Sequence, residues 1–137
     1  MIVKDLMTTN ICFVKPDATI MQVAKQMKSE NIGLVPVCDN TGVLLGVITD
    51  RDIIMRAFVL GTTNLEGLTA KDVMSEHIYT ITPEMNIHDA ALVFSEHKVR
   101  RLPVLENKKL VGILSLTDLA KKKIYLSEIG DIFGAMI

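Results

Sequence analysis

An internal repeat constrains this chain more than any other feature. Shifted by 67 residues, VKDLMT at residues 3–8 aligns with AKDVMS at 70–75, and NIGLVPVCDN at 31–40 aligns with KVRRLPVLEN at 98–107. After a one-residue deletion near Thr41, LLGVITDRDI at 44–53 aligns with LVGILSLTDL at 110–119. Thirteen of the fifty positions from Lys4 to Ile53 are identical in both copies, where chance would give about three. The sequence therefore predicts one supersecondary unit, present twice.

Each copy has the same order of hydrophobic periodicities. A short β-prone segment, 11–14 or 78–81, precedes an amphipathic helix that starts at Thr19 with Gln22, or at Asn86 with Asp89. The predicted buried helix positions follow an i, i+3, i+4, i+7 spacing; they are Ile20, Val23, Ala24 and Met27, and Ile87, Ala90, Ala91 and Phe94. Two strands then flank a turn at DNTG or ENKK, and a second helix is expected over 52–59 or 118–124.

The predicted fold class is α+β, with each copy arranged as β-α-β-β-α. The proline in the LVPV or RLPV strand, which lacks a ladder donor, predicts an edge position or a bulge. A three-stranded sheet with two helices leaves one sheet face poorly covered, so we expect the copies to pack sheet to sheet about a pseudo-twofold axis. The expected boundaries are 1–60 for the first repeat, 61–69 for a GTTNLEGLT linker, 70–124 for the second repeat and 125–137 for an amphipathic tail.

Composition and charge exclude some classes of binding partner. Among the 137 residues, 49% are apolar, which suits one compact core, and the net charge of −1 offers no broad positive field for nucleic acid. The run Lys121–Lys123 follows a helix and is expected to be a solvated helix terminus. The apolar run VLLGVI is too short to span a bilayer, and MIVKDLM is not a signal peptide. These features predict a cytoplasmic protein without nucleic-acid or membrane partners.

The cysteines and histidines do not form a recognisable reactive site. Cys12 and Cys38 lie in apolar runs without the short spacing to histidine that a zinc site needs, so buried reduced thiols are expected. His77, His88 and His97 are expected at helix ends or surfaces rather than as bases, and no nucleophile triad or metal cluster is visible. We therefore expect no enzyme, no metal and no required cofactor.

The duplicated pattern resembles a known family. The DLMT and DVMS openings, the LVPV and RLPV strands, and the GVITDRD and GILSLTD endings resemble a pair of CBS (cystathionine beta-synthase) domains, the Bateman module, from Val3 to about Lys122. The resemblance implies a regulatory rather than a catalytic role. It also implies an adenosine-containing ligand, chiefly AMP, ADP or ATP, with NAD or S-adenosylmethionine as further options, bound in clefts between the repeats.

The GVITDRD ending suits a nucleotide chemically. Thr49 ends a strand, and its hydroxyl and the free backbone N–H groups at the following helix start can accept a phosphate. Asp52 offers two carboxylate oxygens that can accept the hydroxyl protons of a ribose. The alternative is that Thr49 and Asp52 form only a helix-capping box, which occurs widely.

The preferred cleft is chosen by charge. Arg100 and Arg101 precede the strand proline of the second copy, and the resemblance sets them against Thr49 and Asp52 of the first as phosphate ligands. The alternative is that they point into solvent or pair with acids. Arg51 would add a donor or form a surface ion pair. By resemblance, adenine would rest on Ile78, Tyr79 and Ile81, whose counterparts include Val14 and Pro16; ordinary strand packing is the alternative role of these residues.

The second cleft lacks a basic residue at the matched positions. Its expected members are Ile11, Gly33, Leu34, Ser115 and Asp118. It would bind an uncharged adenosine group, bind weakly or stay empty.

The C-terminal tail has two possible roles, and the chain as a whole has two possible functions. Leu126, Ile129, Ile132, Phe133 and Met136 follow a helical spacing, so the tail would cover its own core or help to bury the seam of a homodimer. The first functional hypothesis is a sensor of an adenine nucleotide that signals to an unknown effector protein. The second is a dimerisation or protein-interaction scaffold without a nucleotide.

Overall fold

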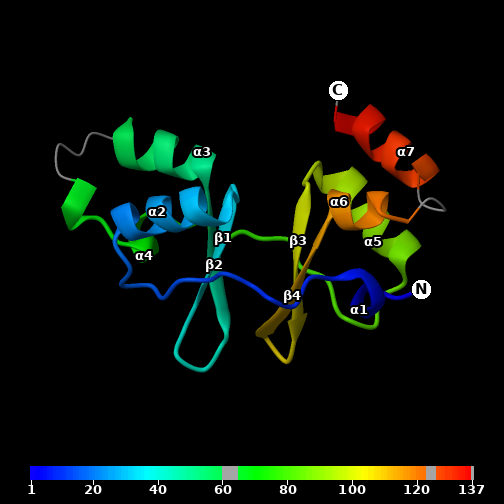
Figure 1. The fold of residues 1–137 in the computed structure, drawn as a ribbon, viewed down its shortest axis with the longest axis horizontal. Coiled ribbons are helices and arrows are strands. Elements are labelled where there is room, and N and C mark those ends of the chain that lie inside the picture. The colour runs from blue at the N-terminus through cyan, green and yellow to red at the C-terminus, as the bar shows by residue number, and fades with distance from the viewer. Residues whose placement is uncertain (60–64, 123–125, 137) are drawn as a thin grey trace. The chain divides into compact units, whose positions relative to one another are not determined.

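The computed structural model describes residues 1–59, 65–122 and 126–136 (Figure 1). The elements in chain order are α1 (Val3–Leu6), α2 (Ile20–Glu30), β1 (Leu34–Cys38), β2 (Leu44–Thr49), α3 (Asp50–Asp52), the π-helical η1 (Ile53–Phe58), the 3-10 helix η2 (Leu65–Gly67), α4 (Ala70–Val73), α5 (Ile87–His97), β3 (Arg101–Glu106), β4 (Lys109–Ser115), α6 (Leu116–Ala120) and α7 (Leu126–Met136). Residues 61–64 of the expected linker and the expected helix end at Ile124 lie outside the described residues. The mixed helix and strand class is confirmed.

The chain forms two compact units, and each contains one antiparallel hairpin. Unit 1 consists of Met1–Ile11 and Tyr79–Ile137 and holds the hairpin β3–β4, while unit 2 consists of Cys12–Ile78 and holds β1–β2. The expectation of one compact core is wrong, because each unit has an apolar core of its own. These cores are formed largely by the predicted helix faces: Ile87, Ala90, Ala91 and Phe94 in unit 1, and Ile20, Val23 and Met27 in unit 2. Ala24 was also predicted to be buried and is only half-buried.

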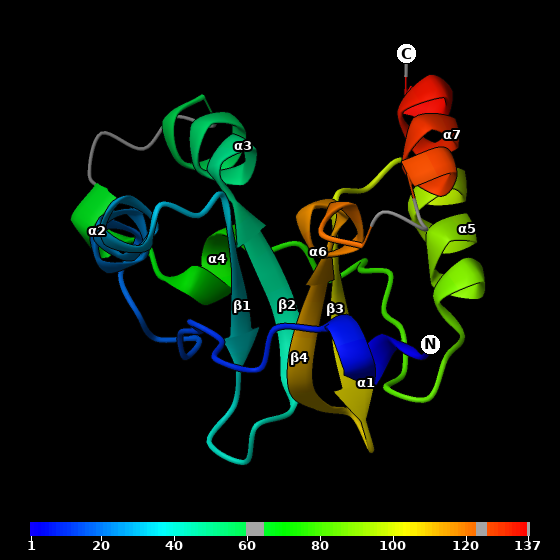
Figure 2. The same cartoon turned by 45° about the vertical axis from the view of Figure 1, so that its right-hand side comes forward.

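The units do not coincide with the sequence repeats, because the two repeats exchange their opening segments. The segment of α1 packs in unit 1, where Thr8 and Ile113 exchange backbone hydrogen bonds of 2.8 and 3.0 Å (Figure 2). The segment of α4 packs in unit 2, where Ser75 and Val47 exchange equivalent bonds of 2.8 and 3.0 Å. The VKDLMT segment therefore completes the second repeat, and AKDVMS completes the first.

Two glycines allow this close approach. A Cβ atom built at Gly46 would lie 2.7 Å from Sδ of Met74 and 2.8 Å from the carbonyl oxygen of Ser75. A Cβ atom at Gly112 would lie 2.5 Å from Sδ of Met7. The glycine that opens GVITDRD and GILSLTD is therefore explained by the exchanged segment packed against it.

The first β-prone segment of each copy is shorter than predicted. It contributes a single parallel bridge, Val14 to Val37 or Ile81 to Val104, so no full third strand forms at residues 11–14 or 78–81. The register of each hairpin shifts shortly after the proline, between Val37 and Cys38 in β1 and between Val104 and Leu105 in β3. The extra residues are Leu45 of β2 and Val111 of β4, on the strand opposite the proline, while Pro36 and Pro103 are paired in register. Each sheet has two strands, so both prolines lie on edge strands, which was the other predicted position.

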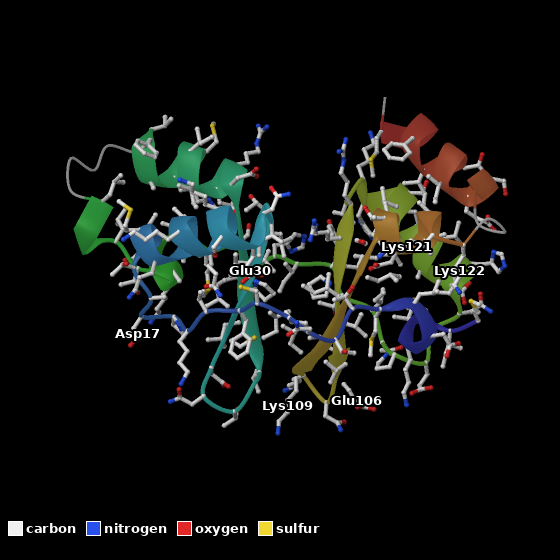
Figure 3. The ribbon with its side chains drawn as sticks, viewed as in Figure 1. Asp17, Glu30, Glu106, Lys109, Lys121 and Lys122 are labelled. Atoms are coloured by element: carbon white, nitrogen blue, oxygen red, sulfur yellow. The ribbon has the colours of Figure 1, made fainter. Side chains whose placement is uncertain are left out.

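The turns follow the predicted chemistry. In DNTG, Asp39 Oδ1 accepts hydrogen bonds from the backbone N–H groups of Thr41 and Val43, at 2.8 and 3.0 Å, and Gly42 adopts a φ of 89°. In ENKK, Asn107 and Lys108 both have positive φ, as a two-residue hairpin requires. Glu106 and Lys109 face each other across this turn at the tip of the hairpin (Figure 3).

The helix starts are local and largely as predicted, with one shift. Thr19 and Gln22 form the expected capping box of α2, and Asn86 accepts a hydrogen bond from the N–H of His88. The second helix of each copy begins at Asp50 or Leu116, two residues before the predicted start, because Thr49 and Ser115 are the N-cap residues. The capping hydroxyl, rather than the aspartate, therefore marks the helix start.

The C-terminal tail forms α7, which packs along α5 in unit 1 (Figure 1 and Figure 2). Ile132 is buried in the core of unit 1, with Ile129 and Met136 partly buried against it, whereas Phe133 is exposed. Nδ1 of His88 on α5 lies 2.8 Å from Oε1 of Glu128 on α7. The tail therefore covers the core of its own unit, as one of the two expectations had it.

Candidate functional site: two Ser/Thr-x-x-Asp turns

In unit 2, β2 ends in a closed capping box. The hydroxyl of Thr49 accepts a hydrogen bond from the N–H of Asp52 at 3.1 Å, and Oδ2 of Asp52 accepts one from the N–H of Thr49 at 2.9 Å. Thr49 and Asp52 therefore do cap the helix that follows β2, as the alternative interpretation predicted. Within the described part of the chain, Oδ1 of Asp52 accepts no hydrogen bond, so one carboxylate oxygen is left for a ligand.

In unit 1, Ser115 and Asp118 repeat this geometry. The hydroxyl of Ser115 accepts from the N–H of Asp118 at 3.1 Å, and Oδ2 of Asp118 accepts from the N–H of Ser115 at 2.9 Å. Asp118 is the single buried charged side chain among the residues that the structure describes. No buried side-chain oxygen or nitrogen in that set lacks a partner, so the unbonded Oδ1 of Asp118 reaches the surface. Both turns thus keep one carboxylate oxygen open.

The expectation of free N–H groups after Thr49 is wrong. The N–H of Asp50 donates to the carbonyl of Gly33 at 3.0 Å, and that of Arg51 donates to the side chain of Asp50 at 2.9 Å. The third N–H, of Asp52, is taken by Thr49. The carboxylate of Asp50, an acid that the sequence argument did not consider, occupies the N–H of Arg51, whereas the hairpin end and the capping box occupy the other two. An anion at this turn would meet a carboxylate and occupied donors.

The equivalent turn in unit 1 carries no such acid. Leu116 stands where unit 2 has Asp50, and its N–H donates to the carbonyl of Arg100 at 3.1 Å. Arg101 faces Ser115 across the hairpin. Both arginines are exposed, and neither forms an ion pair with an acid within the described ranges. The backbone therefore brings Arg100 and Arg101 to the Ser115 turn of their own unit.

Arg100 also has an aromatic neighbour. Its Cζ atom lies 5.9 Å from the ring centroid of Phe133 on α7, within the range of a weak cation–π contact at an exposed site. In unit 2, the positions that match the arginines are Gly33 and Leu34, with Leu34 facing Thr49 across the hairpin. A Cβ atom at Gly33 would lie 3.3 Å from Oδ2 of Asp50. This end of unit 2 is therefore acidic where unit 1 is basic.

The residues expected on the adenine side have different surroundings. Ile81 is buried and holds the bridge to β3, so strand packing explains it. Ile78 and Ile11 are half-buried. Tyr79 is half-buried and its ring stacks on His97, with centroids 3.6 Å apart and planes 14° from parallel. Of this group, Tyr79 alone presents an aromatic surface.

The described residues were also searched for metal sites, reactive thiols and membrane-spanning helices. No three residues of the types His, Cys, Asp and Glu gather there in a way that could hold a metal ion. Burial raises the pKa of the Cys38 thiol to about 11, with a smaller contribution from the charge of Asp39. Both cysteines are free thiols, and Cys38 is buried as predicted, whereas Cys12 is only half-buried. No described helix has the length and hydropathy needed to cross a membrane.

Comparison with protein families finds the same duplication. The family model of the CBS domain matches residues 3–58 and again 70–125. The chain belongs to the CBS domain family. The match covers both repeats and includes both Ser/Thr-x-x-Asp turns, and it does not identify an enzyme family.

Relatives and solved structures with this CBS pair cover most of the chain. The CBS domain-containing protein YhcV of Bacillus subtilis is 42% identical over 119 residues, which is 86% of this chain and 82% of YhcV. The crystal structure of CBSX2 in complex with AMP superposes with a TM-score of 0.80 at 27% identity, covering 92% of this chain and 98% of CBSX2. The CBS pair of MJ0100 in complex with 5-methylthioadenosine and S-adenosyl-L-methionine gives a TM-score of 0.75 at 25% identity, covering 88% and 94%.

The units divide the predicted site residues of this CBS pair. Unit 1 holds Ile11, Tyr79, Ile81, Arg100, Arg101, Ser115 and Asp118, and unit 2 holds Gly33, Leu34, Thr49, Arg51, Asp52 and Ile78. The pairing of Arg100 and Arg101 with Thr49 and Asp52 joins residues of different units and stays a prediction. Sequence reasoning missed Asp50 and His97. Asp50 could have been found by comparing the two endings position by position, because the second copy has leucine there.

Proposed function

We propose that this CBS pair is a regulatory module that binds an adenosine-containing ligand, of the AMP, ADP or ATP class, and passes the binding event to an effector protein. The observation that carries this proposal is the repeated turn in which Asp52 and Asp118 each keep one carboxylate oxygen open. A carboxylate of this kind can accept both hydroxyl protons of a ribose. The complexes of CBSX2 with AMP and of MJ0100 with S-adenosyl-L-methionine support the ligand class.

Charge supports a phosphate on the ligand. Two exposed arginines without an ion pair in the described ranges, Arg100 and Arg101, offer planar donors that match phosphate oxygens. We propose them as phosphate ligands and Arg51 as a further donor, with the Thr49 and Asp52 turn as the preferred ribose site, where the open oxygen of Asp52 accepts the ribose hydroxyls. Ser115 and Asp118, with Ile11, Gly33 and Leu34, would form the second site.

Ligand binding can regulate an effector only if the ligand prefers one arrangement of the module over another. We propose that this occurs in the cytoplasm, where the free thiols of Cys12 and Cys38 stay reduced. No cofactor or metal is needed for binding of this type.

A thermal-shift panel tests the proposed function. AMP, ADP, ATP, NAD and S-adenosylmethionine are compared, with adenosine as the ligand without phosphate. A ligand present at a hundred times its dissociation constant should add about 2.7 kcal/mol to the free energy of unfolding. No stabilisation by any of these ligands would refute the proposal.

Two substitutions, Asp52→Ala and Asp118→Ala, locate the binding turn. Each breaks a capping box as well as a candidate ribose contact, so a matched control is needed. Asp72→Ala supplies it, because Oδ2 of Asp72 likewise accepts from the N–H of the residue that caps its helix, Thr69, at 2.9 Å, and also from the Thr69 hydroxyl at 3.0 Å. All three should lose stability, because each substitution removes the carboxylate that accepts the N–H at its helix start. The AMP response should disappear in Asp52→Ala and persist in Asp72→Ala.

The position of the phosphate is decided by comparing the two ligand-site variants. Loss of the AMP response in Asp118→Ala, with the response of Asp52→Ala intact, would assign the arginines to the Ser115 turn that they adjoin in unit 1. Arg101→Ala should weaken the binding of AMP and leave the binding of adenosine unchanged, because adenosine lacks the phosphate.

A second candidate function is protein interaction, which an apolar surface on unit 2 favours. Ile54, Phe58 and Val59, on and just after η1, are 57%, 60% and 63% exposed. We propose a second copy of the chain as the partner for this surface. The test is light scattering after size-exclusion chromatography: Phe58→Asp should convert a dimer to a monomer, and a monomeric native protein would contradict the proposal.

A further inference from the structure

The C-terminal helix α7 has no role in the proposed function. It spans Leu126–Met136, directly after the second range that the CBS family model matches, which ends at residue 125. In unit 1 it packs against α5 and α6 (Figure 1 and Figure 2). It also contacts Arg100, one of the two candidate phosphate ligands, and the family pattern does not explain this contact.

The contact joins a guanidinium and an aromatic ring. Cζ of Arg100 lies over the ring of Phe133, 5.9 Å from the ring centroid. Within the described ranges, the Arg100 side chain forms no hydrogen bond and no ion pair. Among the residues that the structure describes, the ring of Phe133 is therefore the group that orients this guanidinium.

The backbones on both sides of this contact are held in place. The carbonyl of Arg100 accepts a hydrogen bond from the N–H of Leu116 at 3.1 Å, next to the end of the hairpin. Ile132, the residue before Phe133, is buried in the core of unit 1 and anchors this turn of α7. Phe133 itself is 43% exposed, so its ring lies at the surface beside an exposed arginine. A change of this ring should therefore alter the arginine without disturbing the core.

An arginine that lies over a ring can still bind a phosphate. The ring covers the flat face of the guanidinium, whereas the N–H donors point outward in the plane of the group. The ring and a phosphate can therefore contact the same guanidinium at once. A free arginine side chain loses rotamer freedom when a ligand immobilises it, and a ring that already restricts the side chain lowers this cost. Phe133 should therefore strengthen phosphate binding rather than compete with it.

Arg101 and unit 2 lack an equivalent contact. Among the described residues, Arg101 has no aromatic ring within cation–π range. In unit 2 the position that matches Arg100 is Gly33, which has no side chain to place against a ring. An effect of α7 on phosphate binding should therefore pass through Arg100 alone.

We propose that Phe133 is a positioning residue for the ligand phosphate: it holds the guanidinium of Arg100 ready to bind, and it thereby links α7 to phosphate binding. This inference rests on the proposed function, in which Arg100 binds a ligand phosphate, and it holds whichever turn accepts the ribose. Coupling between two binding events is reciprocal. Because docked α7 strengthens phosphate binding, a bound phosphate strengthens the docking of α7 by the same factor. The tail then reports to an effector whether the ligand carries a phosphate.

Calorimetric titration with AMP and with adenosine tests the positioning role. Phe133→Leu keeps an apolar side chain and removes the ring. It should weaken AMP binding by about two- to fivefold, which is the worth of a cation–π contact at an exposed site. Adenosine binding should not change, because adenosine has no phosphate. Phe133→Trp should bind AMP at least as tightly as the wild type, since tryptophan is the best cation–π partner.

A double-mutant cycle shows whether Phe133 acts through Arg100. Arg100→Ala should weaken AMP binding more than Phe133→Leu does, because it removes the donors themselves. In the Arg100→Ala background, Phe133→Leu should have no further effect on AMP binding. Leu92→Ala removes a side chain that is 58% exposed on α5, so it is the control for loss of exposed apolar surface and should leave AMP binding unchanged. Far-UV circular dichroism checks that each variant is folded.

Hydrogen exchange of the α7 backbone amides measures the reciprocal effect. In the wild type, saturating AMP should slow exchange in α7 by about two- to fivefold more than saturating adenosine does. In Phe133→Leu, AMP and adenosine should slow exchange in α7 equally.

The outcomes distinguish this inference from the function on which it rests. If the wild type binds none of the adenine ligands, both fail. If the wild type binds AMP and Phe133→Leu binds it equally well or more tightly, the positioning role alone is refuted. The same conclusion follows if Phe133→Leu weakens adenosine as much as AMP, or still weakens AMP in the Arg100→Ala background. Equal exchange of α7 with AMP and with adenosine in the wild type refutes the link to the tail.

Discussion

Replacing Gly46 by alanine should destabilise unit 2 through one identifiable contact. The added Cβ atom would lie 2.8 Å from the carbonyl oxygen of Ser75, which accepts the N–H of Val47 at 3.0 Å, and 2.7 Å from Sδ of Met74. The side chain of Met74 can turn away, but the carbonyl can move only by stretching its hydrogen bond. Gly46→Ala therefore acts on the bridge that holds the exchanged segment.

The magnitude follows from three contributions. Overpacking costs about 1–3 kcal/mol, and weakening the bridge hydrogen bond costs about 0.5–1.5 kcal/mol. Reduced freedom of the unfolded chain offsets this by about 0.4–1 kcal/mol. A net loss of about 2 kcal/mol is expected, which would lower the melting temperature by roughly 6–8 °C for a chain of this size. Urea unfolding followed by far-UV circular dichroism measures it.

Gly112→Ala is the matched comparison in unit 1. Its nearest neighbours would be side-chain atoms of Met7, at 2.5 and 3.0 Å, and the carbonyl oxygen of Thr8 is 3.2 Å away. Because a methionine side chain adapts, Gly112→Ala should cost about half as much as Gly46→Ala. A second change, Met7→Ala, should relieve most of that cost in a double-mutant cycle, whereas Met74→Ala should relieve little of the cost at Gly46.

Gly134→Ala serves as the control for the alanine itself. Beyond its own helix backbone and chain neighbours, no described atom lies within 4 Å of a Cβ atom at Gly134 in α7, so this change should stabilise the helix by up to about 1 kcal/mol. Equal costs for Gly46→Ala and Gly112→Ala, or full relief of Gly46→Ala by Met74→Ala, would show that the Ser75 carbonyl does not limit the approach.

Two further predictions concern titratable groups. The pKa of Glu128 is lowered from its usual 4.5 by its own backbone N–H, then by the Ser127 hydroxyl and by His88. A lowered folded pKa gives stability that is present above the unfolded value and is lost as the pH falls, so the free energy of unfolding should drop below pH 4.5. Glu128→Gln should remove this part of the acid dependence, and an unchanged acid titration would contradict it. With a pKa of about 11, roughly one Cys38 thiol in a thousand is ionised at pH 8. In a Cys12→Ser background, an aromatic disulfide reagent should therefore label the native protein far more slowly than the urea-unfolded protein, and equal rates would show that Cys38 is accessible.

The parts of the fold that depend on near neighbours in sequence were predictable. The capping box of Thr19 and Gln22, the buried face of α2 and the turn at Asp39 each need only residues within one or two helical turns. The same holds for the turn of Thr49 and Asp52, whose capping and ligand-binding patterns are identical in sequence. Local chemistry predicts that such a turn exists, and it cannot separate the two roles.

Features that join distant segments were not predictable from one sequence. The two opening segments, VKDLMT and AKDVMS, are so similar that local chemistry does not decide which one packs on Gly46 and which on Gly112. The contact of Tyr79 with His97 depends on how the bridge at Ile81 aligns with the end of α5. The helix start at Asp50 was missed because the predicted helix was counted from Asp52, although Thr49 was recognised as a possible cap and its N-cap role puts the first helical residue at Asp50.

The exchanged opening segments also bear on how the chain is made. All residues of unit 2, Cys12–Ile78, are synthesised before any residue of β3, so unit 2 can complete its fold before unit 1. Thr8, in the segment of α1, precedes unit 2 along the chain, whereas its bridge partner Ile113 follows unit 2. Until unit 1 is synthesised, the apolar side chain of Val3 has no core to enter. A nascent chain that stops after the first repeat would therefore expose the apolar segment of α1. Chaperones bind exposed apolar segments of this kind.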